Sequence, residues 1–430
     1  MKLHRNLVEA VLTGLKMIFE ENRYADKVIE KILQSNTRWG SRDRAFIAEN
    51  TYEIVRWWRL LLYLLKIENI VNPSQFGEGL GFYWRVFGVW QLSQNKELPE
   101  WEELSNLDWE SIKIRLAAAQ NSRKIIESLP DWIDEIGETE LGDKWTTEVK
   151  ALNFQAPVIL RANRLKTTRN ELQTLFRESG VVTHTLQKGD LKKVSNINTD
   201  IALENFYKNG LKDALVLERR SNVFSSPLFK KGFFEIQDAA SQLVAPLLDV
   251  QEGMRVVDAC AGAGGKTLHL ASLMNQKGRI IAMDTEEWKL DELKKRARRN
   301  GATTIETRHI DSTKAIKRLY DSADRLLLDV PCSGLGVLRR NPDAKWKLQI
   351  EFLQSIQKVQ AEILQNYSKI IKKGGKMVYA TCSVLPSESE MQVQKFLEKQ
   401  DGAFTLLEER RVSPAETGFD GFYMACLQKN

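Results

Sequence analysis

Two cysteines stand directly after predicted strands, where thiols could do chemistry. Cys332 follows an apolar run that ends in Asp329, within DVPCS, and Cys382 follows a run that ends in Thr381, within YATCS. Because the carboxyl ends of parallel strands meet at one edge of a sheet, we expect both thiols to face the same crevice. A lone cysteine is most often buried and inert. Two at neighbouring strand ends, one of them beside an aspartate, favour a functional role.

Thiols beside a carboxyl group suit the alkylation of a pyrimidine ring. Carbon 5 of cytosine is a poor nucleophile, but addition of a thiolate to carbon 6 turns it into an enamine carbon that can attack a sulfonium methyl group. An acid near N3 assists the addition, and a base must remove the carbon-5 proton before the thiol can leave. Cys382, Asp329 and Cys332 are available for these tasks.

A glycine-rich turn stands at the end of an earlier predicted strand, directly before a predicted helix. In VVDACAGAGGKT, Gly262, Gly264 and Gly265 permit a tight turn and let backbone amides approach a ligand closely. A phosphate-binding loop would need glycine where Cys260 stands, and a dinucleotide fingerprint would need glycine where Thr267 stands. Both of these nucleotide-binding motifs are therefore disfavoured.

Acidic residues after the next two strands could hold a nucleoside. Asp284 ends RIIAMD, 20 positions after Gly264, where a carboxylate can accept both hydroxyls of a ribose. This favours S-adenosylmethionine over NAD as the cofactor. The alternative for Asp284 is to cap the helix that starts near Glu286. Asp311 could contact the adenine amino group or cap the helix that starts near Ser312.

These groups lie in a region where strands and helices alternate. Strands are predicted at residues 254–259, 279–284, 323–330 and 376–381, with helices at 286–300 and 348–372. This alternation is typical of βαβ units around a parallel sheet, which binds ligands at the carboxyl ends of its strands. Residues 236–430 are therefore predicted to form an α/β domain.

The first half of the chain has a different composition. Nine of the eleven tryptophans lie before residue 150, and apolar residues recur at helical period, so residues 1–145 are predicted to be a helical domain. Residues 146–235 are predicted to be a small α+β subdomain, with strands at 158–161 and 181–186 and a helix capped by Thr168. Its loops carry cations that could contact RNA or form a solvated surface: Lys188, Lys192, Lys193, Arg219, Arg220, Lys230 and Lys231.

Composition excludes several classes of protein. The 43% hydrophobic and 28% charged residues are typical of a globular chain, and the net charge of +6 permits an anionic partner. The N-terminal segment lacks the features of a signal peptide, and no run reaches the roughly 18 apolar residues of a membrane span, so we expect a cytoplasmic protein without membrane contact. No CxxC or HxH pair is present, so we expect neither a metal nor a disulfide framework.

Five segments, in this order, carry a resemblance to a known family: FFEIQDAASQL, DACAGAGGKT, AMD, LLLDVPCSGLGVLRRNPDAKW and YATCSVLPSESE. Together they resemble the bacterial ribosomal-RNA cytosine-5 methyltransferases of the Sun/Fmu type, within the wider Nop2/Sun family. Upstream, SRDRAFIAENTYEIVRWWRLL resembles the NusB-like helical domain of these enzymes, and APVILRANRLKTTRNEL their small RNA-binding subdomain. The resemblance implies a Rossmann-like class I methyltransferase fold, S-adenosyl-L-methionine as cofactor and small-subunit ribosomal RNA as partner; we expect a monomer.

The resemblance also implies a role for each site residue. Asp284 would hold the ribose, Asp311 would lie on the adenine side and Asp329 would line the active site. Cys382 would be the nucleophile, and Cys332 would help to release the product. The family usually has Ala-Pro where this chain has Gly262-Ala263, and the loss of proline frees a φ angle and loosens the turn. The turn implied to wrap the methionine end of the cofactor consists of Cys260, Ala261, Gly262, Ala263, Gly264, Gly265 and Lys266.

Other functions stay open at this point. The same chemistry could act on transfer RNA, or the chain could be a ribosome-assembly factor that binds RNA without catalysis, although the intact cysteines and Asp329 argue against lost catalysis. An amino-group methyltransferase is disfavoured because the strand ends in DVPC rather than in Asn/Asp-Pro-Pro-aromatic. Arg339 and Arg340 are predicted on the RNA surface. A solvated face is favoured over RNA contact for the helix cluster Lys294, Lys295, Arg296, Arg298 and Arg299.

Overall fold

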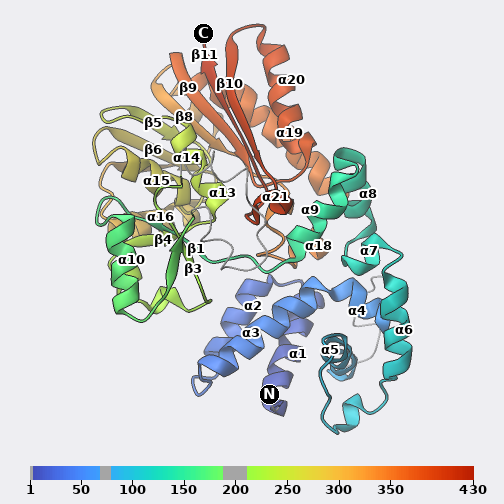
Figure 1. Cartoon of the computed structure of the whole chain (residues 1–430). Helices are drawn as coiled ribbons and strands as arrows, with labels where there is room; N and C mark the ends of the chain where they lie inside the picture. The colour runs from blue at the N-terminus through green and yellow to red at the C-terminus, as the bar shows by residue number, and fades with distance from the viewer. Residues whose placement is uncertain (1–2, 68–78, 187–210) are drawn as a thin grey trace. The chain divides into compact units, whose positions relative to one another are not determined.

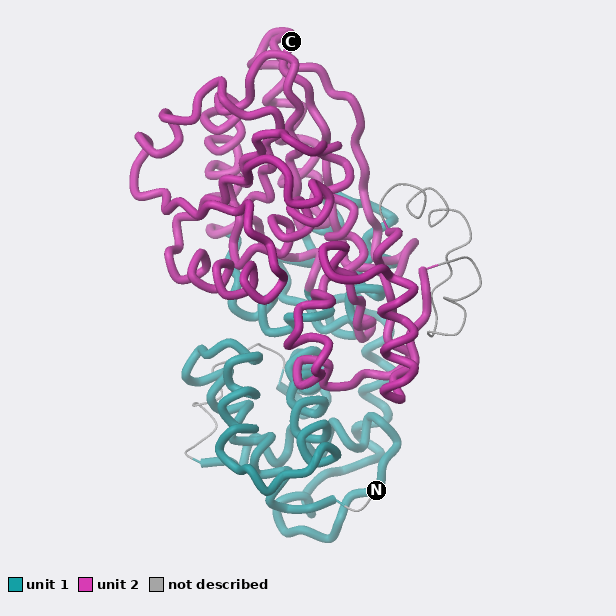
Figure 2. The backbone as a smooth tube through the Cα atoms, turned by 90° about the vertical axis from the view of Figure 1, so that its left-hand side faces the viewer, with its two compact units in different colours: residues 1–153, 338–350 teal, residues 154–337, 351–430 magenta. Residues whose placement is uncertain are grey.

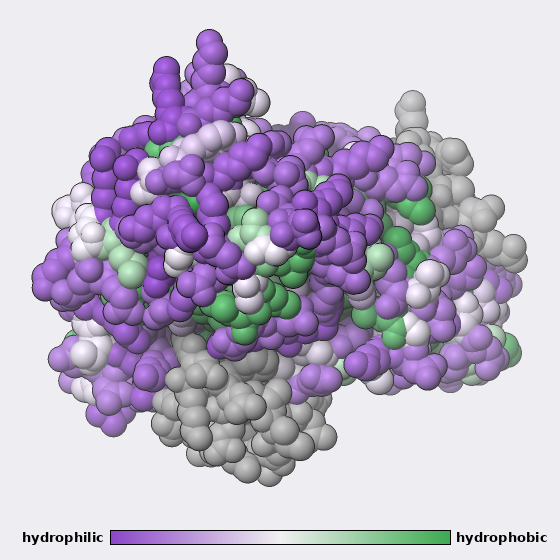
Figure 3. All heavy atoms as spheres, turned by 90° about the horizontal axis from the view of Figure 1, so that it is seen from above, coloured by the Kyte–Doolittle hydropathy of each residue, from purple (hydrophilic) through white to green (hydrophobic). Residues whose placement is uncertain are grey.

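The computed structural model describes residues 3–67, 79–186 and 211–430, which leaves the predicted loop residues Lys188, Lys192 and Lys193 outside the described part. The chain divides into two compact units (Figure 2). Unit 1 consists of Met1–Asn153 and Leu338–Ile350, and unit 2 of Phe154–Val337 and Glu351–Asn430. None of the described helices combines the length and the apolar character that crossing a membrane requires. The face seen in Figure 3 is mostly hydrophilic, with its apolar side chains in small groups.

Unit 1 is helical, as the period of its apolar residues predicts. Its first four helices bury a common core in which Trp58 is 1% exposed and stacks on Phe19, with ring centroids 3.8 Å apart. The helices are α1 (Arg5–Phe19), α2 (Ala25–Ser35), α3 (Ser41–Arg56), α4 (Trp58–Leu64), α5 (Gly81–Ser93), α6 (Trp109–Ala119), α7 (Arg123–Ile126), α8 (Asp131–Leu141), α9 (Lys144–Asn153) and, from the later segment, α18 (Ala344–Lys347).

The later segment of unit 1, Leu338–Ile350, is tied to the helices by side-chain hydrogen bonds. The indole of Trp346 donates to the carbonyl of Val55 at 2.7 Å, and Arg56 donates to the carbonyl of Arg339 at 3.0 Å. Arg339 is only 5% exposed. Its prediction as a surface residue for RNA is therefore wrong, because the segment after the Pro-Cys motif packs into the helical unit instead of lying on a free surface.

Unit 2 contains a seven-stranded sheet, and the predicted Rossmann-like α/β fold is confirmed. The strand order is β10-β11-β9-β8-β5-β6-β7. The five strands from β9 to β7 in this order run parallel, as expected for the four predicted strands β5, β6, β8 and β9, whereas β11, which was not predicted, pairs antiparallel with both β9 and β10. The strands are β5 (Arg255–Asp258), β6 (Arg279–Asp284), β7 (Ile305–His309), β8 (Ala323–Asp329), β9 (Ile371–Thr381), β10 (Phe404–Val412) and β11 (Phe422–Lys429).

Helices cover both faces of this sheet (Figure 1). Alternate strand residues point to opposite faces, so Val256 packs with α14, α15 and α16, whereas Val257 packs with α17, α19 and α20. The predicted helix at 348–372 ends earlier, because Ile371 already pairs with Ala323 in the sheet. The helices are α13 (Ala239–Gln242), α14 (Val244–Leu247), α15 (Gly265–Leu273), α16 (Glu287–Asn300), α17 (Thr313–Lys317), α19 (Ile350–Tyr367), α20 (Glu390–Gln400) and α21 (Pro414–Thr417).

A second, smaller sheet in unit 2 corresponds to the predicted α+β segment. It is antiparallel, with the order β2-β3-β1-β4: β1 (Ile159–Ala162), β2 (Thr183–Thr185), β3 (Ala214–Leu217) and β4 (Phe234–Ile236). One face packs on α10 (Arg169–Glu178), and the other joins the core of the large sheet. Thr168 caps α10 as predicted and forms a capping box with Glu171. The short helix α12 (Pro227–Lys230) precedes β4.

Candidate active site

The two predicted cysteines meet at the carboxyl ends of adjacent strands. β8 and β9 run parallel and in register, with Asp329 opposite Ala380, so the loops that follow them leave the sheet at the same edge. The sulfurs of Cys332 and Cys382 lie 3.3 Å apart, and both side chains are partly exposed. The geometry therefore presents two thiols side by side to one site.

An ion pair stands at the same edge of the sheet. The ammonium group of Lys266, in the first turn of α15, lies 2.6 Å from the carboxylate of Asp329. It also lies 4.9 Å from the centre of the Phe422 ring, a contact that favours a cation. The lysine side chain is 12% exposed and the aspartate 28%. This arrangement places a hydrogen-bonded ion pair at the end of β8, the strand that leads into the Cys332 loop.

A cavity of about 420 Å³ opens beside the ion pair, which is a volume suited to a small-molecule ligand. Among the predicted cofactor residues, Cys260, Gly262, Asp284 and Asp329 line it. Asp311 is exposed, accepts a hydrogen bond from the hydroxyl of Ser312 and is not among the lining residues, so its contact with adenine stays a prediction. Sequence reasoning missed these lining residues: Thr285, Lys289, Ile310, Thr313, Glu362, Ile363, Asn366 and Tyr367.

Asp284 connects the glycine turn to the start of α16. Its carboxylate accepts the backbone N–H of Gly262 at 2.8 Å and that of Glu286 at 2.9 Å, and the residue is 8% exposed. The residue at the N-cap position of α16 is Glu286, which differs from the capping alternative for Asp284. Because each carboxylate oxygen has further acceptor capacity, Asp284 can still bind hydroxyl groups from the cavity.

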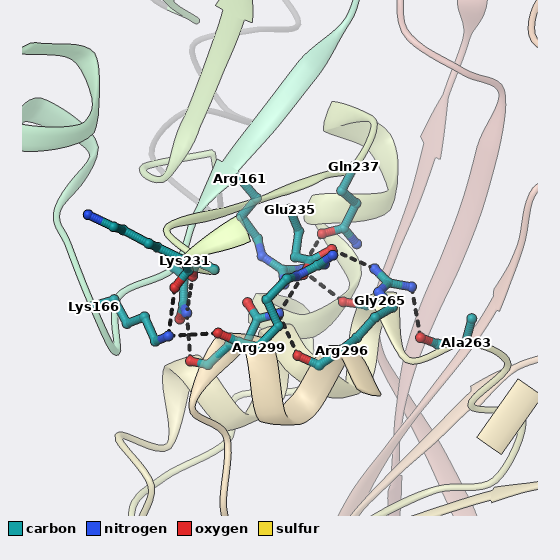
Figure 4. Close-up of polar contacts among 12 residues, drawn as sticks. Arg161, Lys166, Lys231, Glu235, Gln237, Ala263, Gly265, Arg296 and Arg299 are labelled. Atoms are coloured by element: carbon teal, nitrogen blue, oxygen red, sulfur yellow. Dashed lines mark hydrogen bonds and ion pairs between the residues drawn. The ribbon is translucent and has the colours of Figure 1, made fainter. Parts of the chain in front are cut away.

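The glycine turn is held by two arginines from outside it (Figure 4). Arg296 of α16 donates to the carbonyl of Ala263 at 2.7 Å, and Arg161 of β1 donates to the carbonyl of Gly265 at 2.9 Å. Gly264 has φ +87°, and a Cβ there would lie 2.5 Å from the side chain of Leu293. The turn thus has no room for a larger residue at position 264. Its carbonyls at Ala263 and Gly265 are fixed by the two arginine side chains.

One of these two arginines, Arg296, also pairs with a buried acid of the small sheet. Glu235 of β4, whose side chain is 4% exposed, pairs with Arg296 at 2.8 Å and with Arg299, and it accepts a hydrogen bond from Asn300. Burial favours a higher pKa for Glu235, but Arg296, Asn300 and Arg299 outweigh it and leave the pKa lowered. Glu235 therefore links the small sheet to α16 and the turn.

The basic cluster on α16 consequently divides into two parts. Lys294 and Lys295 pair with acids of their own helix on the surface, which fits the expected solvated face. Arg296 and Arg299 instead point to Glu235, so for these two residues the expected solvated face is wrong. They pair with the buried carboxylate of Glu235, on a strand far from α16 in sequence, and the periodicity of the helix does not indicate this pairing.

Burial and neighbouring groups raise the pKa values of three cysteines. The hydrogen bond to Cys382, burial and the charge of Glu388 raise the pKa of Cys332 well above its usual value. Burial and the nearby carboxylates raise the pKa of Cys260 as well. Cys332 and Cys260 thus hold their protons at neutral pH in the free protein. Cys426 lies in β11, and burial raises its pKa to about 11.

A buried acid beside the cysteine loops escaped the sequence reasoning. Glu388 is 0% exposed and accepts hydrogen bonds from Ser333 and Ser383, the residues that follow the two cysteines. It lies within YATCSVLPSESE, where a run of polar residues resembles a solvated turn. Nothing in this run of polar residues indicates that Glu388 is buried.

The chain is similar in sequence to known methyltransferases. A family model described as 16S rRNA methyltransferase RsmB/F matches residues 245–428, and a model of an RsmF/B-like ferredoxin-like domain matches residues 129–190. A ribosomal RNA small subunit methyltransferase B from Vibrio vulnificus is 31% identical over 321 residues, which is 73% of this chain and 69% of the relative. A probable ribosomal RNA small subunit methyltransferase B from Synechocystis is 29% identical over 417 residues, 90% of this chain and 88% of the relative.

A solved structure is similar over the whole chain. The crystal structure of PH0851 aligns with a TM-score of 0.80 at 21% identity and covers 100% of both chains. At this level of identity the likeness concerns the fold.

Proposed function

We propose that this chain, which belongs to the RsmB/F family of 16S rRNA methyltransferases, transfers a methyl group from S-adenosylmethionine to carbon 5 of a cytosine in small-subunit ribosomal RNA. The observation that carries the proposal is the pair of thiols 3.3 Å apart beside the Lys266–Asp329 ion pair. The names of the relatives support small-subunit ribosomal RNA as the substrate.

The cavity at the strand ends fits the cofactor. Its 420 Å³ lie against Gly262 and Asp284, whose carboxylate has acceptor capacity for ribose hydroxyls. The turn that ends in Lys266 would hold the methionine end, and Asp311 would lie on the adenine side. When bound, S-adenosylmethionine supplies the sulfonium methyl group.

Cys382 would attack carbon 6 of the cytosine as a thiolate. Addition places negative charge on the ring toward N3, where a hydrogen bond from the Lys266–Asp329 pair would stabilise it, and carbon 5 becomes nucleophilic. Cys382 is the candidate for attack because its segment YATCSVLPSESE resembles the family segment that carries the nucleophile.

Cys332 would act in the release of the product. After methylation, carbon 5 carries both the methyl group and its original hydrogen. A base must take this hydrogen as a proton, whereupon the bond between carbon 6 and sulfur breaks, the ring double bond reforms and Cys382 leaves as a thiolate. Cys332 would first give its own proton to water, and its thiolate, a strong base because its pKa is raised, would then take the carbon-5 proton beside Cys382.

Two cysteine variants test the proposal. We expect Cys382→Ala to be inactive and to form no covalent complex with RNA. We expect Cys332→Ala to attack and accept the methyl group but to release slowly, so that a protein–RNA adduct survives denaturing electrophoresis. Cys426→Ala, which removes a thiol in β11 away from the two loops, is the matched control and should turn over without an adduct.

The pattern of adducts distinguishes the outcomes. An adduct with Cys382→Ala and none with Cys332→Ala would reverse the two roles. Two active variants without any adduct would refute covalent catalysis. Bisulfite sequencing of small-subunit ribosomal RNA, with and without the gene, identifies the methylated cytosine.

A further inference from the structure

The two cysteine loops have the same local structure. Each contains the sequence Cys-Ser-x-Leu, at residues 332–335 and 382–385. In each loop the serine hydroxyl accepts the backbone N–H of the leucine two positions later, at 3.3 Å for Leu335 and 3.1 Å for Leu385. In each loop the same hydroxyl also donates to the carboxylate of Glu388, at 2.5 Å in both cases. One carboxylate therefore ends two equivalent loops.

The remaining contacts of Glu388 fix its position. The carboxylate also accepts the backbone N–H of Ser333 at 2.8 Å and the side-chain amide of Gln360 at 3.1 Å. Its own carbonyl accepts the phenol of Tyr379, in β9, at 2.7 Å. An ionised carboxylate is an acceptor only, and all four of the groups that meet it here are donors. The site is therefore built for a charged Glu388, held from β9 and α19.

We propose that Glu388 is a positioning residue that holds both cysteine loops in register, so that the sulfurs of Cys332 and Cys382 stay side by side through the reaction. The inference rests on the covalent function proposed above. Glu388 itself meets the serines and not the sulfurs, so it acts through the loops that carry the thiols.

Direct contact between the loops supports this role. The backbone N–H of Gly336 donates to the carbonyl of Cys382 at 2.9 Å, and a Cβ at position 336 would lie 2.7 Å from that carbonyl. The loops therefore pack backbone to backbone on one side and share Glu388 on the other. A shift of either loop by about 1 Å would separate the thiols, and a misplacement of this size can cost about 100-fold in rate.

Glu388 also contributes charge to the thiol pair. The ionisable groups that face the Cys332 sulfur are Cys382 on the neighbouring loop, Glu388, and Tyr379 of β9, whereas α19 contributes the neutral Gln360. The hydrogen bond to Cys382 and burial raise the pKa of Cys332 most, and the charge of Glu388 raises it further. Two substitutions separate the length of the Glu388 side chain from its charge.

Glu388→Asp keeps the charge but is too short to bridge both loops, and Glu388→Gln keeps the reach but loses the charge. We expect kcat to fall about 10- to 100-fold in both, with the KM values for S-adenosylmethionine and RNA close to those of the wild type, while the lost buried hydrogen bonds lower the melting temperature by a few degrees. Alkylation of Cys332 by iodoacetamide, followed by mass spectrometry, should shift to lower pH in Glu388→Gln and stay nearer the wild-type profile in Glu388→Asp.

Glu390→Gln is the matched control. Glu390 is the same residue type two positions away, and it pairs with Arg411 instead of the serines. This variant should keep the wild-type kcat and the wild-type alkylation profile.

Two results would overturn the inference. A kcat within twofold of the wild type in both Glu388 variants would show that the loops keep the two sulfurs side by side without Glu388. A loss of kcat that always accompanies a lower melting temperature and a higher KM for the cofactor would reduce Glu388 to a structural residue. Failure of the proposed function is distinguishable, because it would already be seen as the absence of an adduct in Cys332→Ala with Glu388 intact.

Discussion

Two parts of unit 2 are fixed in different ways, the cysteine loops and the glycine turn. The loops are held by an acid from the large-sheet region itself, since Glu388 follows Cys382 by six positions and also binds Ser333 of the other loop, 55 positions before it. The turn is held from far along the chain, by Arg161 of β1 and by Arg296 of α16, which is itself paired with Glu235 of β4. The reactive thiols thus depend on contacts among elements of the large sheet, whereas the turn depends on the small sheet.

This difference shows that the small sheet supports the turn. A subdomain that only bound RNA could be attached loosely, but one face of this sheet joins the core of the large sheet and its strands β1 and β4 support the turn. Damage to the small sheet should therefore affect cofactor binding before it affects the chemistry of the thiols. Damage at Glu388 should do the reverse.

The largest effect is expected from Glu235→Ala. The substitution leaves Arg296 and Arg299 partly buried without their acid, and breaking a buried ion pair in this way costs about 3–5 kcal/mol in the free energy of unfolding. The loss in unfolding free energy is measured by urea unfolding, with hydrogen exchange of the amides in β1 and β4 as the probe. A loss below about 1 kcal/mol would mean that the network does not support the small sheet.

The contribution of Glu235 should depend on pH in a defined direction. Burial opposes ionisation, but Arg296, Asn300 and Arg299 leave its pKa lowered relative to the unfolded chain. Stabilisation by a group of this kind is complete above the unfolded pKa of about 4.3 and is lost as the pH falls through the lower folded value. The difference in unfolding free energy between the wild type and Glu235→Gln should therefore be constant near pH 7 and shrink below about pH 4.

Gly264→Ala breaks the turn from within. The new side chain must adopt a left-handed backbone with φ +87° and displace Leu293, whose side chain lies 2.5 Å from the Cβ position. Backbone strain and overpacking together cost about 2–4 kcal/mol. Calorimetry should show weaker binding of S-adenosylmethionine. Unchanged affinity would remove the turn from the cofactor site.

The elements of the α/β fold could be predicted because their signals are local. Strands of apolar residues that alternate with helices gave β5, β6, β8 and the end of β9, and the Thr168 cap gave the start of α10. The antiparallel direction of β11 could not be predicted, because direction depends on how the chain returns to the sheet. The burial of Arg339 could not be predicted either, because its packing partners lie in helices far earlier in the chain.

Within the site, the motif residues were predictable and their supports were not. Residue type and position at strand ends indicated four site residues: Cys332, Cys382, Asp329 and Asp284. In the structure, all four lie at the carboxyl ends of strands, at one edge of the large sheet. Glu235 and Glu388 act through buried contacts with residues distant in sequence or hidden in polar runs, and a single sequence contains no record of which acids are buried.

Arg296→Gln separates the two regions most directly. It removes the donor to the Ala263 carbonyl and one partner of Glu235, while the cysteine loops keep all their contacts. We expect the KM for S-adenosylmethionine to rise about tenfold, which corresponds to the loss of one hydrogen bond from a charged group. At saturating cofactor, kcat should stay close to the wild type. Lys294→Gln, on the exposed face of the same helix, is the control and should change neither constant. A fall in kcat alone would contradict the division between the turn and the thiols.

Thr168→Ala gives the smallest expected effect and limits how far the small sheet influences the turn. The hydroxyl of Thr168 accepts the backbone N–H of Glu171, whose carboxylate accepts the N–H of Thr168, and loss of the N-cap costs about 1 kcal/mol. Helix α10 packs on the face of the small sheet away from the large sheet, and the hydroxyl of Thr168 caps this helix. Thermal unfolding should therefore begin at a lower temperature, while calorimetric affinity for S-adenosylmethionine stays at the wild-type value. A parallel loss of affinity would show that general loosening of the small sheet reaches the turn, and the specific role of Glu235 and the two arginines would then be lost.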